Sequence, residues 1–153
     1  FTYSIVTNID AEHLDYYKSL NKIKESFSQF LEKIPSVGKG FLCIDDKNIK
    51  EILKKTKNKN FYTYGIKNHS NFQILNISQK ANFSRFDIKI NIPGKKKLIK
   101  NIKIPLIGLH NIKNVTSVFA VAFSIGIQSI STNSLVVFID PFKYFASETK
   151  NLA

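Results

Sequence analysis

The feature that most constrains the fold is a change in the spacing of apolar residues near residue 70. Before that point, short apolar runs alternate with segments whose apolar residues recur at helical spacing. After it, in residues 72–106, apolar residues recur mostly at every second position. A period of about 3.6 is typical of a helix with one buried face, and a period of about two is typical of a strand. The first half therefore predicts strands and helices that alternate around a parallel sheet, and the second half predicts antiparallel strands.

The first half can be divided into elements from these runs and their flanking residues. Buried strands are expected at residues 3–9 and 39–44, and a further strand at 61–66. A helix should begin after Ser19, whose hydroxyl suits an N-cap, and a short helix should follow Asp45-Asp46.

The second half predicts ribbon strands near residues 72–77, 83–92 and 98–106, with the lysines 95–97 in a solvated turn at Pro93-Gly94. A buried helix should then run from the segment after Gly108 to Gly126. The predicted fold class is α/β, with a mostly parallel sheet flanked by helices and an antiparallel β-ribbon insertion.

The charge of the chain raises the possibility of a polyanion partner. The net charge is +12, but Arg85 is the only arginine, so the forked side chain that grips phosphates and guanine edges is scarce. Specific nucleic-acid binding is therefore unexpected. A basic module that binds nucleic acid or another polyanion remains the alternative hypothesis.

Other bulk features bear on the setting of the protein. No apolar run approaches the roughly 20 residues that cross a membrane, and no signal peptide is apparent, so a cytoplasmic location is expected. The single cysteine, Cys43, cannot form an internal disulfide and is expected in the core. Because the chain starts at Phe1 and contains no methionine, it is expected to be part of a longer product.

Two polar clusters could carry chemistry. The first places His13 among Asp10, Glu12 and Asp15 at the end of the first expected strand. Imidazole and carboxylates together can bind Mg²⁺ or Mn²⁺, although a histidine near a helix start is more often a cap or a surface residue.

The second cluster is His110, Asn111 and Asn114, just after Gly108. Asparagine amides can pair with the edge of an adenine because they both donate and accept hydrogen bonds. The residues alone favour the simpler interpretation, in which Asn111 caps the helix and Gly108 allows the chain to enter it.

Together these clusters resemble a known family. The segments TNIDAEHLDYY and GLHNIKNVTSVFAVAFSIGI, with IKESFSQFLEKIPSVGKGFLCIDD and YTYG between them, are similar to the central ATPase domain of the Mur ligases. Residues 1–130 are expected to be the later part of that domain, and residues 131–153 a tail of unassigned character. Within the family, the intermediate segments resemble the members that join UDP-N-acetylmuramate to L-alanine.

The resemblance implies an ATP-dependent, amide-forming reaction in the complete enzyme. A substrate carboxylate takes the γ-phosphoryl group of ATP, and the resulting acyl phosphate is captured by the amine of an amino acid. His13 matches a histidine that binds the second metal, Mg²⁺. Asn111 and Asn114 match the asparagines that contact adenine, and His110 matches the histidine beside them.

Three departures from the family pattern limit what the chain is expected to do alone. The 153 residues contain no G-x-x-x-x-G-K loop to hold phosphates, and Ile107 stands where a proline usually precedes the glycine. The tail after residue 130 does not resemble the junction to an amino-acid-binding domain. Missing N-terminal and C-terminal segments are therefore expected as partners in catalysis, and the chain alone is not expected to be active.

Overall fold

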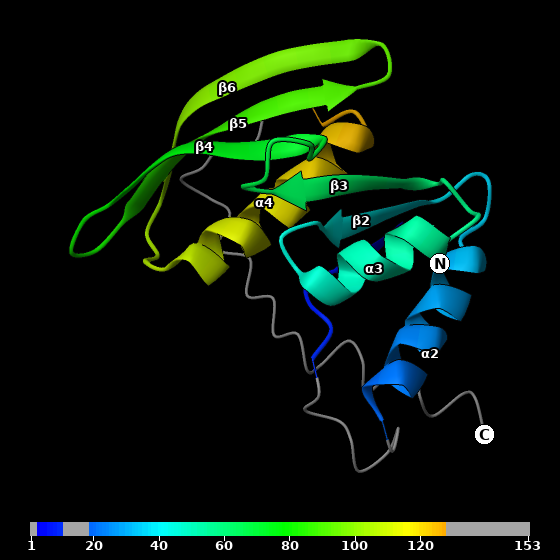
Figure 1. The fold of residues 1–153 in the computed structure, drawn as a ribbon. Coiled ribbons are helices and arrows are strands. Elements are labelled where there is room, and N and C mark those ends of the chain that lie inside the picture. The colour runs from blue at the N-terminus through cyan, green and yellow to red at the C-terminus, as the bar shows by residue number, and fades with distance from the viewer. Residues whose placement is uncertain (1–2, 11–18, 128–153) are drawn as a thin grey trace.

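The computed structural model describes residues 3–10 and 19–127 (Figure 1). The predicted tail at 131–153 lies outside these residues. The elements in chain order are β1 (Tyr3–Val6), α2 (Leu20–Glu32), β2 (Lys39–Cys43), α3 (Lys47–Lys55), β3 (Phe61–Gly65), β4 (Phe72–Gln79), β5 (Ser84–Ile92), β6 (Lys95–Ile104) and α4 (Leu109–Ser124). No helix within the described part is long and apolar enough to cross a membrane.

All six described strands form one sheet in the order β1-β2-β3-β4-β5-β6. The first four run parallel to one another, and β4, β5 and β6 pair antiparallel. The predicted α/β class is therefore confirmed, with the antiparallel ribbon continuing the parallel sheet. Only Tyr64↔Phe72 and Gly65↔Gln73 pair across the junction between β3 and β4.

The helix starts follow the predicted capping chemistry. Ser19 Oγ accepts a hydrogen bond from the Lys22 N–H at 3.3 Å, and Asp46 Oδ1 accepts one from the Ile49 N–H at 2.8 Å. Each of these bonds satisfies an N–H that has no partner within its helix. The sequence therefore predicted correctly where α2 and α3 begin.

The helices cover opposite faces of the sheet (Figure 1). On one face, the segment just after α2 approaches so closely that a Cβ at Gly40 would lie 2.9 Å from Ile34 Cδ1. On the other face, Phe72 meets Phe123 of α4 edge-on, with ring centroids 6.1 Å apart. The buried core therefore lies in two layers, one on each side of the central strands.

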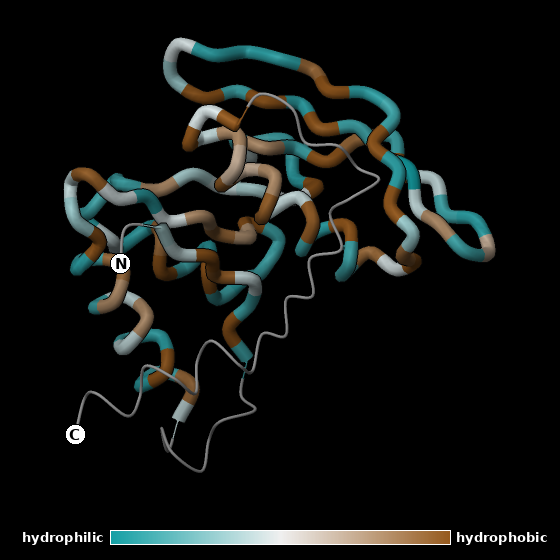
Figure 2. Tube along the Cα trace, turned by 180° about the vertical axis from the view of Figure 1, so that it is seen from behind, coloured by the Kyte–Doolittle hydropathy of each residue, from teal (hydrophilic) through white to brown (hydrophobic). Residues whose placement is uncertain are grey.

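The antiparallel ribbon, β4 to β6, contains the alternation of apolar and polar residues from which it was predicted. Apolar and polar residues alternate along β5 (Figure 2), where Phe86, Ile88 and Ile90 are buried while Lys89 is exposed. The ribbon also contains two irregularities in register, where Asn76 and Asn101 adopt positive φ angles of 52° and 57°.

Asp87 connects these two irregularities. Its carboxylate accepts a hydrogen bond from Asn76 Nδ2 at 2.8 Å and another from the Asn101 N–H at 2.8 Å. The bond from Asn76 is the main cause that lowers the pKa of Asp87. One carboxylate on the middle strand therefore holds the deviating backbone of both neighbours.

Three predictions about the elements were wrong in detail. The first strand ends at Val6, and it lies at an edge of the described sheet with Tyr3 and Ile5 43% and 36% exposed, so it is not a buried strand. The lysines 95–97 lie in β6 as paired, exposed strand residues and not in a turn. The last helix is only partly buried, because one side of it faces away from the sheet.

Candidate functional site

The first turn of α4 presents the residues that the sequence singled out. Gly108 is the N-cap, with φ 99°, and no side chain caps the helix. Asn111 instead donates from Nδ2 to the Ile107 carbonyl oxygen at 2.7 Å. Its side chain therefore supports the loop before the helix, and the prediction that Asn111 caps the helix was wrong. A cap requires a side-chain acceptor for a backbone N–H, and Asn111 uses its donor.

The other two candidates contact each other. His110 and Asn114 lie one turn apart, and Asn114 Nδ2 is 3.0 Å from His110 Nε2, which accepts the bond when the proton is on Nδ1. His110 is exposed, and Asn111 and Asn114 are half-buried. No hydrogen bond within the described part of the chain uses the amide oxygen of either asparagine. Both side chains therefore retain an acceptor and a second N–H for a ligand.

The carboxyl ends of the parallel strands meet beside this turn. Asn48 of α3 donates to the Ile9 carbonyl oxygen at 2.6 Å and so fixes the backbone that follows β1. Asn8 donates to Asp10 Oδ2 at 2.8 Å in the same segment. His13, the predicted metal ligand, lies outside the described residues. Residues 3–10 and 19–127 contain no group of three His, Cys, Asp or Glu side chains that could hold a metal ion.

Asp45 forms the best-connected polar contact at this edge. It lies in the turn after β2, separated from Cys43 by Ile44, and its carboxylate lies 2.9 Å from Lys113 Nζ of α4. It also accepts hydrogen bonds from the backbone N–H of Ile66 at 3.0 Å and of Lys67 at 3.2 Å, just beyond β3. Burial opposes ionisation of Asp45, but the Ile66 N–H and the Lys113 ammonium outweigh it and lower the pKa. Asp45 is therefore a carboxylate that joins three elements.

The sequence pattern predicted Asp45 only as part of a helix start and predicted no role for Lys113. A signal was available, because Asp45 and Gly65 each stand at the end of a predicted parallel strand, and such ends share one edge of a sheet. Lys113 also lies between the two candidate asparagines. The pairing itself joins residues far apart in the chain, which no local pattern reveals.

Cys43 was predicted in the core and is 3% exposed. Burial raises its pKa, so the thiol remains protonated at neutral pH. The cysteine therefore belongs to the core, as predicted, and offers no reactive thiolate.

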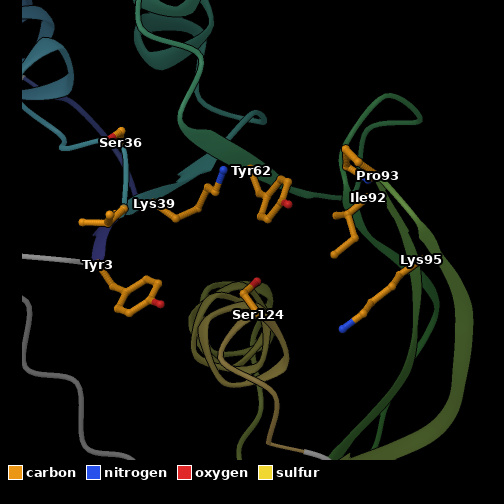
Figure 3. Close-up of a pocket in the computed structure, with 10 residues that line it drawn as sticks. Tyr3, Ser36, Lys39, Tyr62, Ile92, Pro93, Lys95 and Ser124 are labelled. Carbon is orange, nitrogen blue, oxygen red and sulfur yellow. The ribbon is translucent and has the colours of Figure 1, made fainter.

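The structure also contains an open hollow of about 260 Å³ far from these residues. It lies at the end of the sheet where β1 and β2 begin. The β5–β6 turn and the end of α4 also line it (Figure 3). Tyr3, Lys39, Tyr62, Lys95 and Ser124 are among its lining residues. None of the residues that line it is a carboxylate or a histidine, so it is not the candidate site.

Known proteins are similar to this chain over most of its length. Residues 1–122 match the family model described as the Mur ligase middle domain. The UDP-N-acetylmuramate–L-alanine ligase of Pelagibacter ubique (strain HTCC1062) is 58% identical over 128 residues, which cover 83% of this chain and 28% of that protein. The enzyme of the same name from Dictyoglomus turgidum is 39% identical over 128 residues, which cover 84% of this chain and 26% of that protein. The chain thus spans little more than a quarter of the length of these relatives.

Solved structures agree on the fold. The MurF ligase of Thermotoga maritima in complex with ADP matches with a TM-score of 0.66 at 10% identity, over 86% of this chain and 29% of that one. A crystal structure of MurF from Acinetobacter baumannii matches with a TM-score of 0.61 at 19% identity, over 83% of this chain and 29% of that one. The relatives support the ligase interpretation of the sequence and not the polyanion-binding alternative. Because the family match covers 122 of the 153 residues, the chain belongs to the Mur ligase middle-domain family.

Proposed function

We propose that this chain is part of an ATP-dependent ligase that joins UDP-N-acetylmuramate to L-alanine in peptidoglycan synthesis. The observation that carries the proposal is the 58% identity over 128 residues to a protein of that name. In this proposal, residues 1–130 belong to the central domain, and other segments supply the phosphate-binding loop and the amino-acid site.

The role proposed for the described residues is recognition of adenine. An adenine edge offers an amino donor beside a ring-nitrogen acceptor. Asn111 and Asn114 fit this edge chemically, because each keeps one amide oxygen and one N–H that no hydrogen bond within the described residues uses. His110 orients the amide of Asn114, which it contacts at 3.0 Å. Bound ATP would supply the phosphoryl group that activates the substrate carboxylate.

The proposal includes Mg²⁺ with His13 as one ligand, by resemblance to the family alone. Asn8 and Asp10, which follow β1, carry side-chain oxygens a few residues before His13 in the sequence. The described residues do not complete a metal site by themselves.

An NMR titration of the chain with ADP tests the adenine role. The side-chain amide signals of Asn111 and Asn114 should shift, and Asn111→Ala combined with Asn114→Ala should raise the Kd by about tenfold or more, because two hydrogen bonds are lost. Asn21→Ala is a matched control, since Asn21 is an exposed asparagine on α2. Equal ADP affinity in the double variant and the unaltered chain would refute the assignment.

A further inference from the structure

The ion pair between Asp45 and Lys113 is built more firmly than an ordinary surface pair. The two side chains are 12% and 24% exposed, whereas the partners in the Lys24–Glu51 pair on α2 and α3 are 20% and 57% exposed. Asp45 is also held by two backbone N–H groups beyond β3, so the position of its carboxylate does not depend on Lys113 alone. Partial burial and fixed geometry are the conditions in which an ion pair has a measurable effect.

The end of β3 is shaped around this carboxylate. A Cβ at Gly65 would lie 2.8 Å from Asp45 Cγ and 2.8 Å from Oδ1, and Gly65 has φ +146°, where other residues are strained. Lys67 adds a contact from Nζ to the Asp45 carbonyl oxygen at 3.2 Å. The glycine therefore allows the carboxylate to occupy the space beside the strand end.

Lys113 occupies the position on α4 from which it can set the rotation of the helix. Ile112, with no exposed surface, anchors the helix start against the core. Successive residues are about 100° apart around a helix, so Lys113 lies on a different side from the buried face that Ile112, Thr116 and Ala120 form, and that face alone leaves small rotations of the first turn less restrained. Lys113 adds a polar contact to another element on that side, in a first turn that no side chain caps and that Asn111 ties only to the loop just before it.

We propose that Asp45 and Lys113 are positioning residues for the nucleotide: their ion pair fixes the rotation of the first turn of α4, and so the direction in which Asn111 and Asn114 face the adenine. This inference rests on the proposed function. It assigns a role to a carboxylate and an ammonium that need not contact the nucleotide themselves.

The test measures the affinity of the chain for ADP and for adenosine by NMR titration. Lys113→Gln removes the positive charge, Lys113→Arg keeps it, and Asp45→Asn removes the negative charge of the hydrogen-bond acceptor. Lys113→Gln should raise both Kd values by about fivefold to tenfold, and Lys113→Arg should recover most of the affinity. Adding Asp45→Asn to Lys113→Gln should cause little further loss, because both changes break the same contact. Lys24→Gln, which breaks the exposed pair, should leave both affinities unchanged.

The outcomes separate the two proposals. Asparagine-dependent binding in the unaltered chain, with unchanged affinity in Lys113→Gln, would overturn the positioning role and leave the proposed function standing. A loss confined to ADP would also overturn it, because it would mean that Lys113 attracts the phosphates directly. If the unaltered chain binds neither ligand, or binds independently of Asn111 and Asn114, the proposed function fails and the positioning role fails with it.

Discussion

Substituting Gly65 with alanine tests whether the strand end is built around the Asp45 carboxylate. A Cβ at Gly65 would meet three carboxyl atoms of Asp45 at 2.8 to 2.9 Å, so the carboxylate must move away from the N–H groups of Ile66 and Lys67 and from Lys113. The positive φ adds about 1–3 kcal/mol of strain. Loss of the charged contacts adds about 1–2 kcal/mol after allowance for solvent. The free energy of unfolding should therefore fall by about 3 kcal/mol.

Urea denaturation followed by circular dichroism measures this loss. With a denaturant slope of about 2 kcal/mol/M, the midpoint should fall by roughly 1.5 M. Gly94→Ala is the control, because Gly94 also has a positive φ, +74°, but a Cβ there meets nothing within 4 Å. It should cost only about 1 kcal/mol. Equal losses at Gly65 and Gly94 would show that the carboxylate contact contributes nothing.

Four further outcomes follow from the contacts described above. The contribution of Asp45 to the free energy of unfolding should not change with pH near neutrality and should decrease below about pH 4. The folded pKa of Asp45 lies below its unfolded value, so its contribution is complete above that value and is lost as pH falls through the folded pKa; an acid titration should show a smaller decline in Asp45→Asn. Asp87→Ala should lower the melting temperature and increase the rate of amide hydrogen exchange in the ribbon, because it releases both positive-φ backbone positions. Unchanged exchange rates would argue against this role. Phe72→Ala should cost about 3–5 kcal/mol in urea denaturation, since the fully buried ring leaves a cavity, and a loss under 1 kcal/mol would contradict the packing. Cys43 should react with iodoacetamide at pH 8 only after denaturant is added, and rapid labelling of the folded chain would contradict its burial.

Much of the fold could be predicted from local pattern. The helix starts at Ser19 and Asp46 were predicted correctly because an N-cap interaction spans only three residues. The alternation in β5 predicted which side chains are buried, since successive strand residues point to opposite faces. The candidate asparagines could be named from the sequence because they lie in one short segment, GLHNIKN, that resembles a family motif.

Other features were decided by contacts between distant parts of the chain. The exposure of β1 depends on which strand pairs beside it, and the direction of the Asn111 amide depends on how the Ile107 carbonyl is placed. The pairing of β4 with β3 joins the ribbon to the parallel sheet through two residue pairs, which a period-two pattern cannot reveal.

The sequence by itself determined the kinds of element, the residues that cap two of the helices, and the family to which the chain belongs. Only the tertiary structure decided that Asp45 and Lys113, which lie on a strand end and a helix far apart in the chain, form one contact beside the candidate adenine site. The physical reason is one of range. Capping and periodicity act between neighbours within a turn or a strand, whereas an ion pair across a sheet edge exists only after the core has brought both elements together.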